Sequence, residues 1–429
     1  MKNYSIWEEI EGINFDELKD DINVDVLIVG GGITGILCAY ELKKRNINCL
    51  IVEKNKIGGG ISKNTTAFLS VKHDILYQDL IKNKGINKAL EYLNLNKNAI
   101  DEYEKISQKY DIDFKRCDSI FYSCNDEEKI LNEKNALDKL GYNTKLVDEI
   151  KLPIKIKKGL KFFNQATIHP LKCIYSLAKE LNIYENTEIV NIKNNCAYTK
   201  NNKIEFKKII IATHFPCINK RGLYFMKMHQ RRSYVALIKY DKKINNTYCS
   251  IDDNGMYFRG YNDYLIMGGN DRDTKEICQR SFLNRSYELF HKDIEYSYSN
   301  QDCITLDQIP YIGFHSRFNK DYLVATGFNM WGYTWAMAAS FIIADIICGK
   351  KKNELVDPLR ITINTKLFSN IGNSIVNLVK LKKLRCSHLG CTLNYNKIDN
   401  VYECPCHGSR FNMNGEVIDG PACKKIKIK

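Results

Sequence analysis

A strand–turn–helix–strand pattern near the start of the chain constrains the fold more than any other feature. Residues 24–54 read "VDVLIVGGGITGILCAYELKKRNINCLIVEK", in which two apolar runs enclose a glycine-rich turn and an apolar helical stretch. Gly30, Gly32 and Gly35 have the spacing G-x-G-x-x-G. The first glycine permits a tight turn, the second lets a pyrophosphate approach the backbone N–H groups, and the third lets helix and strand pack closely. The pattern therefore predicts a βαβ unit that binds a dinucleotide.

An acidic residue completes this pattern. Glu53 ends the second apolar run, where a carboxylate accepts hydrogen bonds from the ribose hydroxyls of an adenosine. Ile33 and Thr34 occupy the predicted start of the helix, where the backbone faces the pyrophosphate. A glycine motif alone is weak evidence, but strand, helix, second strand and acid stand here in order. This order favours a dinucleotide site over a βαβ unit that binds nothing.

Further segments carry a resemblance to a known family. The stretch "KIGGGISKNTTAFLS" (56–70) suits a loop that wraps backbone donors around a flavin, and "FKKIIIATHFP" (206–216) is a buried strand that runs into a turn. The stretch "YLVATGFNMWGYTWAMAAS" (322–340), which follows "IPYIG", is a strand, a glycine-containing loop and a helix. In this order the segments resemble the D-amino-acid oxidase and glycine oxidase superfamily of FAD enzymes, over roughly residues 5–358.

The resemblance implies an α/β (α+β) two-domain flavoprotein over residues 1–358. A Rossmann-like FAD-binding domain would be interleaved with an antiparallel-sheet substrate domain. The last loop and helix start would lie against the isoalloxazine, where a helix N-terminus favours the anionic reduced flavin. Besides the glycine motif, Ile33, Thr34 and Glu53, the implied cofactor-binding residues are Thr65, Thr66, Thr213, Gly327, Phe328, Gly332 and Thr334.

The residues between these segments would form the substrate side. Helices are predicted over 76–110 and 126–140, and strands over 228–240 and 255–269. Arginines and tyrosines on such strands suit a carboxylate or an amine, although any one of them could face solvent or core instead. The candidates are Arg231, Arg232, Tyr234, Tyr257 and Arg259, of which Tyr257 and Arg259, together with Trp331, are the predicted catalytic residues. The lone histidines His169, His214 and His229 are expected to be structural or close to the flavin.

A cluster of cysteines and histidines follows near the C-terminal end. Within "CSHLGCTLNYNKIDNVYECPCHGSRF" (386–411), Cys386-x-His388 precedes Cys404-x-x-His407. Two thiolates and two imidazoles on separate loops are the ligands of a Rieske [2Fe–2S] centre. Cys₂His₂ also suits zinc, but zinc fingers usually pair cysteine with cysteine and histidine with histidine. The cysteines scattered through the rest of the chain are expected to be reduced core residues.

The same stretch closely resembles the Rieske proteins of respiratory cytochrome bc complexes, and "GPACKK" (420–425) looks like their third loop. Cys391 and Cys406 fall where that family carries a disulfide, and whether it forms here stays open. Ser409 matches a serine that bonds a bridging sulfide, whereas Phe411 replaces a tyrosine that bonds a ligand sulfur. Fewer donors would stabilise the reduced cluster less.

The predicted domains follow from these motifs. Residues 359–383 are expected to be a linker with a short helix, and residues 384–429 a small all-β Rieske cluster-binding subdomain. So short a segment can hardly build a core alone. It must therefore lean on the flavin domain or on a partner.

Composition excludes other classes of function. The net charge of +14 comes from 64 basic residues interleaved with 50 acidic ones, and no nucleic-acid motif accompanies them. The apolar stretch 336–349 is too short to span a membrane and contains Asp345, so a buried helix is predicted. The acidic N-terminal segment lacks an apolar signal core, which favours the cytoplasm.

Together the two halves resemble a bacterial family of glycine-oxidase-like flavoproteins fused to a Rieske module. A flavin accepts two electrons at once and releases them singly, whereas an iron–sulfur cluster takes one at a time. We therefore expect an FAD- and [2Fe–2S]-dependent dehydrogenase that oxidises an amine or amino acid and passes electrons through the cluster to an unidentified one-electron acceptor. The alternatives are a redox sensor or electron-transfer protein without metabolite turnover, and a reductase that runs in the opposite direction.

Overall fold

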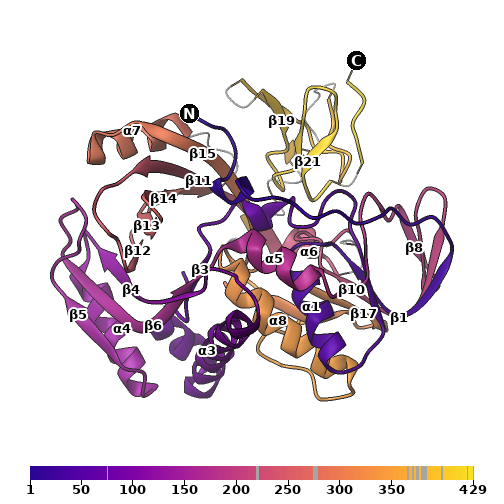
Figure 1. The fold of residues 1–429 in the computed structure, drawn as a ribbon, viewed down its shortest axis with the longest axis horizontal. Coiled ribbons are helices and arrows are strands. Elements are labelled where there is room, and N and C mark those ends of the chain that lie inside the picture. The colour runs from indigo at the N-terminus through magenta and orange to yellow at the C-terminus, as the bar shows by residue number, and fades with distance from the viewer. Residues whose placement is uncertain are drawn as a thin grey trace.

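The computed structural model describes residues 1–74, 76–218, 222–273, 279–364, 367–369, 372, 376–377, 384–397, 400–422 and 424–428. Two large sheets and their helices form a two-sheet body from residues 1–364, and a small third sheet forms a C-terminal module from residues 384–428 (Figure 1). The predicted fold class is confirmed. The predicted helix of the linker falls mostly outside the described residues.

The first sheet contains the predicted βαβ unit. Its strand order is β16-β17-β10-β1-β2-β7, and β1, β2, β7, β10 and β17 are parallel. The bounds are β1 Ile22–Val29, β2 Cys49–Val52, β7 Ile183–Tyr184, β10 Lys203–Ile211, β16 Tyr311–Ser316 and β17 Asn319–Thr326, with the hairpin β8 Asn191–Lys193 and β9 Cys196–Tyr198 attached to β10. Both faces are covered only over the C-terminal halves of β1 and β10, which is why 26–29 and 209–211 are continuous apolar runs.

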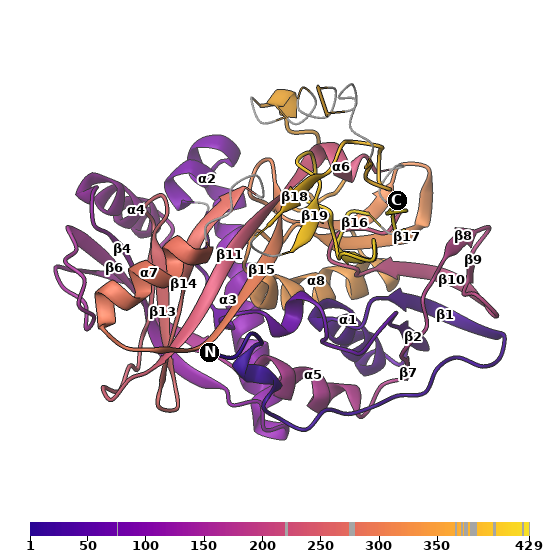
Figure 2. The same ribbon diagram turned by 90° about the horizontal axis from the view of Figure 1, so that it is seen from above.

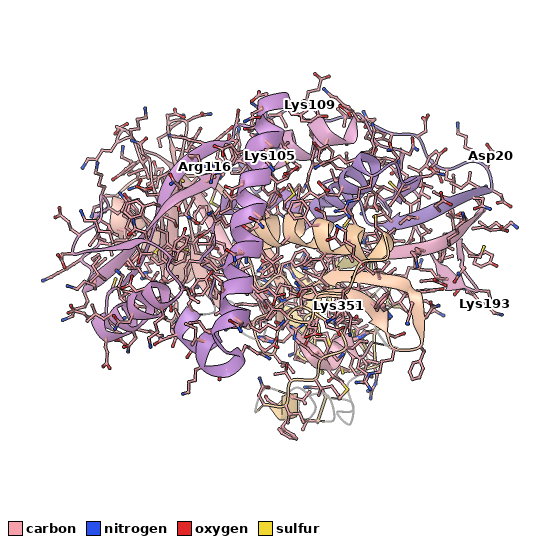
Figure 3. The ribbon with its side chains drawn as sticks, turned by 90° about the horizontal axis from the view of Figure 1, so that it is seen from below. Asp20, Lys105, Lys109, Arg116, Lys193 and Lys351 are labelled. Atoms are coloured by element: carbon pink, nitrogen blue, oxygen red, sulfur yellow. The ribbon has the colours of Figure 1, made fainter. Side chains whose placement is uncertain are left out.

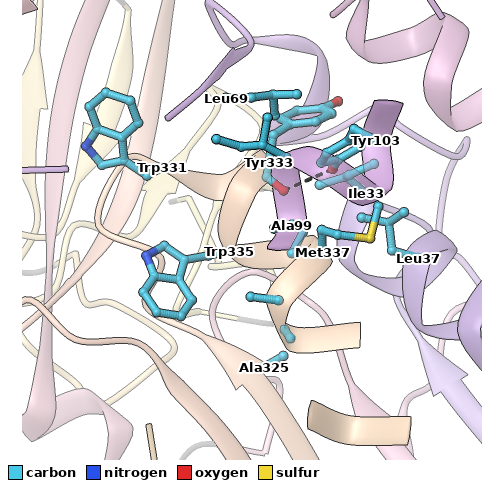
Figure 4. Packing of buried hydrophobic residues seen from close by; sticks show 14 of the residues in the cluster. Ile33, Leu37, Leu69, Ala99, Tyr103, Ala325, Trp331, Tyr333, Trp335 and Met337 are labelled. Atoms are coloured by element: carbon cyan, nitrogen blue, oxygen red, sulfur yellow. Dashed lines mark hydrogen bonds between the residues drawn. The ribbon is translucent and has the colours of Figure 1, made fainter. Parts of the chain in front are cut away.

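Helices pack on this sheet and carry most of the core. α1 (Ile33–Lys44) begins directly after the glycine turn and packs against α8 (Gly332–Ile347), while α5 (Pro170–Ala178) lies next to α1. Figure 4 shows the packing around α8, where the hydroxyl of Tyr103, from α3 (Ile86–Lys109), donates a hydrogen bond to the Tyr333 carbonyl at 2.9 Å. The apolar stretch 336–349 is therefore the buried helix that its sequence predicted.

The helical region 76–110 forms two helices rather than one. Gly85 has a φ of +83° and separates α2 (Tyr77–Lys84) from α3 (Ile86–Lys109), because a left-handed residue cannot continue a helix. α3 runs beside α8 across one face of the body, with Lys105 and Lys109 near its C-terminal end (Figure 3). The second predicted helix is α4 (Glu127–Lys139).

The second sheet has the strand order β15-β11-β14-β13-β12-β4-β6-β3, with β5 paired to β6. The predicted strands at 228–240 and 255–269 are β11 and the β13–β14 hairpin. The bounds are β3 Phe68–Leu69, β4 Lys115–Ser123, β5 Thr144–Val147, β6 Lys158–Thr167, β11 Met228–Lys239, β12 Thr247–Ser250, β13 Met256–Tyr261, β14 Tyr264–Asp273 and β15 Ile294–Thr305, with helices α6 Tyr224–Lys227 and α7 Gln279–Phe290 and 3-10 turns η1 Ile6–Glu8 and η2 Ile61–Lys63.

The C-terminal module leans on the body, as its small size required. Its strands are β18 Asn394–Asn396, β19 Val401–Glu403, β20 Arg410–Phe411 and β21 Val417–Asp419, each paired antiparallel to the next. The module lies over β11, β15 and α6 (Figure 2). Among the described residues, no helix has the length and apolar character of a membrane span. The cytoplasmic location stays a prediction.

Candidate active site and cluster site

The glycine turn has the geometry that the motif predicted. Gly30 has a φ of +111°, and a Cβ there would lie 2.6 Å from the Ala212 carbonyl oxygen. A Cβ on Gly35 would lie 2.0 Å from the Gly30 carbonyl oxygen. These two glycines are therefore required for the turn and for close packing of α1 on β1.

Gly32 differs from these two glycines, because a Cβ added there would face a side chain that can move. A Cβ there would meet only the Ser62 hydroxyl, at 3.0 Å. That hydroxyl accepts a hydrogen bond from the Ile33 N–H at 3.0 Å. The backbone N–H groups at the start of α1 thus form a site for an anion. The Ser62 hydroxyl contacts this site, and a ligand can displace it. Ser62 lies in the glycine-rich stretch, but no spacing rule singled it out.

The predicted adenosine acid lies in the same turn. The Glu53 carboxylate accepts hydrogen bonds from the Gly31 N–H at 2.8 Å and from the Asn55 N–H at 2.9 Å. The side chains of Ile33 and Thr34 are buried, so only their backbone N–H groups can face a ligand. These residues fit the adenosine and pyrophosphate portions of FAD.

A cavity of about 620 Å³ opens between the second sheet and the start of α8. Five predicted site residues line it: Thr65, Thr66, Tyr257, Trp331 and Gly332. A Cβ on Gly332 would meet no atom within 4 Å. The start of α8 is thus open to a bound ring system.

Trp331 is fixed in the wall of this cavity. Its Nε1 donates a hydrogen bond to the Asp74 carboxylate at 3.0 Å. Its ring stacks on His73, with centroids 4.9 Å apart and an interplanar angle of 29°. The tryptophan therefore holds one orientation above the open start of α8.

Other predicted cofactor residues shape the cavity's surroundings without lining it. The buried Thr334 hydroxyl accepts a hydrogen bond from the Ser70 N–H at 3.3 Å. Thr213 organises the turn after β10, because its hydroxyl donates to the Phe215 carbonyl at 2.9 Å. Gly327 has a φ of +71°, and Phe328 packs on the main core.

Arg259 lies where the sequence did not predict it. Its Nη1 donates hydrogen bonds to the carbonyls of Thr66, Ala67 and Ile168 at 2.6, 3.1 and 3.1 Å. The guanidinium also lies 5.2 Å from the Trp7 ring. Arg259 is not among the residues that line the cavity. It supports the turn that presents Thr66, in contrast to the predicted contact with substrate.

Arg231 is the arginine candidate that lines the cavity. Its guanidinium lies 3.8 Å from Asp74, and its cross-strand partner on β15 is Asp302. Arg232 points to the C-terminal module instead, and Tyr234 stacks on Phe282 with centroids 6.3 Å apart. The cavity therefore selects Arg231 and Tyr257 from the five strand candidates.

Carboxylates gather around Arg231. Asp74, Asp271 and Asp302 all line the cavity. Burial, followed by the charge of Asp74, raises the pKa of Asp271 to about 8 and that of Asp302 to about 7. Asn300 donates a hydrogen bond to Asp302 at 2.6 Å, whereas Asp271 Oδ1 is buried with no hydrogen-bond partner among the described residues. The wall can therefore hold a cation or accept a proton near neutral pH.

Sequence reasoning missed two buried titratable residues in the same wall. Lys72 and His73 are almost fully buried, and the Lys72 ammonium donates to the His73 carbonyl. Burial lowers the pKa of Lys72, and burial together with Lys72 lowers the pKa of His73 well below its usual value. A neutral His73 fits its partners, since Nδ1 faces the Tyr92 hydroxyl at 2.7 Å and Nε2 faces the Ser70 carbonyl at 2.8 Å. The polar residues of "VKHD" (71–74) were the signal in the sequence that could have indicated this site. Surface loops contain similar residues, so the signal does not distinguish a buried site from a loop.

Two of the three lone histidines make structural hydrogen bonds. His169 caps α5, because its Nδ1 accepts a hydrogen bond from the Lys172 N–H at 3.2 Å. His214 Nε2 faces the Gln301 carbonyl at 2.9 Å. His229 lies on β11, half-buried.

The four predicted cluster ligands converge on two equivalent loops. In each loop the cysteine carbonyl accepts a bond from a glycine four residues later, Gly390 or Gly408, at 2.9 Å. The Cys386 and Cys404 thiols are hydrogen-bonded to each other, and the rings of His388 and His407 lie 5.1 Å apart at 86°. Two thiols on one side and two imidazoles on the other form the donor set that a [2Fe–2S] cluster requires.

Further residues of the module surround the predicted cluster ligands. The sulfurs of Cys391, Cys404 and Cys406 all lie within 4.8 Å of one another, and the disulfide between Cys391 and Cys406 stays a prediction. The Ser409 hydroxyl contacts the Cys386 thiol, and it accepts a hydrogen bond from the Ala422 N–H at 3.0 Å. Phe411 is fully buried against the cysteines.

The imidazole edge of the module faces the body. The His388 ring lies 6.4 Å from Phe215 and 6.0 Å from Phe225, and the His407 ring lies 6.0 Å from Phe225. Phe215 belongs to the turn after β10, the strand that pairs with β1, and Phe225 belongs to α6. The cluster ligands therefore pack on the FAD-type half of the molecule.

Comparisons with known proteins agree with both halves. Residues 25–346 match the family model described as FAD dependent oxidoreductase, and residues 376–428 match the Rieske [2Fe-2S] domain. The chain is 31% identical to the Rieske 2Fe-2S iron-sulfur protein YhfW of Bacillus subtilis, over 96% of this chain and 95% of that protein.

Solved structures share the fold of the body. The glycine oxidase of Geobacillus kaustophilus superposes with a TM-score of 0.68 at 16% identity, covering 80% of this chain and all of that one. The L-proline dehydrogenase of P. horikoshii gives a TM-score of 0.66 at 21% identity, covering 79% of this chain and 98% of that one. The chain thus belongs to the FAD dependent oxidoreductase family and carries a C-terminal Rieske domain, so that its cofactors are FAD and a [2Fe–2S] cluster.

Proposed function

We propose that this oxidoreductase is a dehydrogenase that oxidises a C–N bond of an amine or amino acid and delivers the electrons, one at a time, to an external one-electron acceptor. When bound, FAD accepts the substrate hydride as an electron pair, and the cluster carries single electrons. One observation carries the proposal: the His388 ring packs on Phe215 in the turn that follows β10, and the His407 ring packs on Phe225 of α6. An enzyme that reduced oxygen directly would need no cluster at that position.

The cavity supplies the groups that an amine substrate needs. The carboxylates of Asp271 and Asp302 attract an ammonium group and, with raised pKa values, can accept a proton from it. Loss of that proton leaves the neutral amine, which is the form that gives up a hydride. Arg231 offers a fork for a carboxylate, and Trp331 and Tyr257 form the walls that orient the substrate. The names glycine oxidase and L-proline dehydrogenase, carried by proteins of the same fold, support an amine or amino-acid substrate.

Anaerobic spectroscopy tests this function. The purified protein is mixed with a panel of amines and amino acids, and the flavin absorbance is followed before a one-electron acceptor is added. We expect at least one compound to bleach the flavin, and the acceptor to restore its colour faster in wild type than in Cys386→Ser. If no compound bleaches the flavin, the redox-sensor alternative replaces the dehydrogenase. Midpoint potentials that place the cluster well below the flavin would favour the reductase direction.

A further inference from the structure

One strand pair separates the substrate cavity from the Rieske domain. On β11 and β15, Arg231 pairs with Asp302 and Arg232 pairs with Gln301. Successive residues of a strand point to opposite faces, whereas cross-strand partners share a face. Arg231 and Asp302 accordingly line the cavity, and Arg232 and Gln301 contact the C-terminal module.

The contact with the module is a buried polar cluster. Arg232 Nη2 lies 2.8 Å from Glu403 Oε1, and the two side chains are only 2% and 9% exposed. Gln301 accepts a hydrogen bond from Arg232 at 3.1 Å and donates one to the Gly408 carbonyl at 2.8 Å. Arg410 of the module also contacts Glu403, at 3.2 Å.

These contacts hold one cluster loop at both of its ends. Glu403 directly precedes the ligand Cys404, and Gly408 directly follows the ligand His407. The body therefore holds the 404–407 loop through Arg232 at one end and through Gln301 at the other. Phe215 and Phe225 cover the imidazoles between them.

We infer that Arg232, Gln301 and Glu403 form a latch that keeps the Rieske domain docked, so that the cluster works as a fixed internal relay rather than a mobile shuttle. The inference rests on the proposed electron path between flavin and cluster. Asn364 bonds to the body and Asn377 to the module, and the stretch between them can span up to about 40 Å when extended, so chain length alone does not hold the domain. Separation of the two parts would leave Arg232 without its carboxylate partner, whereas Glu403 would keep Arg410, and loss of the partner is costly for a buried charge.

The latch is tested on the full-length protein with both cofactors bound. A light flash reduces the flavin with electrons from an added sacrificial donor such as EDTA, without any substrate, and the rate at which the cluster becomes reduced is recorded optically. In wild type this rate should not change with solvent viscosity, because no domain motion precedes the transfer. Glu403→Gln and Arg232→Gln should slow this rate by at least about tenfold. Removal of one partner of a buried ion pair costs more free energy than a tenfold change corresponds to.

Controls distinguish the latch from general damage. Glu416→Gln makes the same chemical change on an exposed residue of the module, and its rate should match wild type. Iron content and the electron paramagnetic resonance spectrum should stay unchanged in both latch variants, while protease cleavage of the module increases. Gln301→Leu tests the latch from the body side if Glu403→Gln does not fold.

Two results would overturn the latch: unchanged rates in Glu403→Gln, Arg232→Gln and Gln301→Leu, or a wild-type rate that falls as viscosity rises. A wild type in which the flash-reduced flavin never reduces the cluster would instead contradict the proposed electron path. The failure of the latch and the failure of the proposed function are thus distinguishable.

Discussion

Arg231 and Arg232 are neighbours on β11, but their guanidinium groups lie on opposite sides of the sheet. Arg231 lines the substrate cavity and lies 3.8 Å from Asp74. Arg232 forms a 2.8 Å ion pair with Glu403 of the Rieske domain. A single strand therefore contributes to the site where electrons would enter the protein and to the contact that positions the cluster.

Gly32→Val should abolish FAD binding while the protein still folds. A Cβ at this position meets only the movable Ser62 hydroxyl, but its methyl groups would fill the cradle at the start of α1. The ratio of flavin absorbance to protein absorbance measures the effect, and circular dichroism checks the fold. Gly12→Val is the matched control, because a Cβ there has only the Tyr175 hydroxyl nearby, at 3.8 Å. A yellow Gly32→Val protein with full flavin content would contradict this placement of the pyrophosphate.

Removal of the charge at Arg231 and at Arg259 should affect different properties, substrate binding in the first case and stability in the second. Arg259→Gln removes three hydrogen bonds to buried carbonyls and should lower the free energy of unfolding by about 3 kcal/mol or more. Arg231→Gln should leave that free energy within about 1 kcal/mol and instead raise KM for substrates that carry a carboxylate. Thermal unfolding and steady-state kinetics separate the two effects. Equal destabilisation by both substitutions would show that Arg231 is also structural.

The affinity for a cationic ligand should increase with pH between about 5 and 8. Asp271 and Asp302 have pKa values raised to about 8 and 7, so they are neutral at low pH and become charged through this range. The groups that face these two carboxylates in the cavity are Asp74, Arg231 and Asn300. For one competing proton, affinity changes by up to about tenfold per pH unit. Titration of the flavin spectrum with a primary amine measures this change.

The variants Asp271→Asn and Asp302→Asn should flatten that pH profile, whereas the exposed Asp263→Asn should not. The free energy of unfolding should change with pH in the opposite direction to the affinity. The folded state holds a proton on Asp271 up to about pH 8, whereas the unfolded chain releases it near pH 4. This group therefore destabilises the fold increasingly as pH rises through that window, and Asp271→Asn should raise the melting temperature more at pH 8 than at pH 5. An equal shift at both pH values would contradict the raised pKa.

Substitution of a cluster ligand should remove iron and leave FAD in place. Cys386→Ser or His407→Ala disrupts the module, whose contacts lie outside the glycine turn and cavity. Metal analysis and the flavin absorbance measure the two cofactors separately, with the exposed Cys348→Ser as the control. Zinc in place of iron in the wild-type protein would exclude the Rieske centre.

Phe411→Tyr should raise the midpoint potential of the cluster. The Phe411 ring is fully buried against the cysteines, and a hydroxyl that donates to the Cys386 sulfur would favour the more negative reduced state. A hydrogen bond of about 1.5 kcal/mol corresponds to about 65 mV for one electron. Ser409→Ala should lower the potential, because it removes an existing donor near Cys386. Protein-film voltammetry gives both values, and an unchanged potential in Phe411→Tyr would place the ring edge away from the sulfur.

The sequence by itself determined the features that depend on local spacing. Gly30 and Gly35 specify the turn because a Cβ at either would clash with nearby backbone, and Gly32 leaves room for the pyrophosphate. Cys386, His388, Cys404 and His407 belong to two short loops, so their ligand spacing is visible without any knowledge of the fold.

Only the tertiary structure decided which side chains face the cavity. Arg231 and Arg232 are equally good candidates in the sequence, since a strand reaches both faces and a shift of one residue in register exchanges them. Arg259 was predicted to contact substrate, but its hydrogen bonds to carbonyls at 66, 67 and 168 depend on how distant segments meet. The contact between Arg232 and Glu403 could not be predicted either. The two residues are far apart in the chain, and such pairs leave no periodic signal in the sequence.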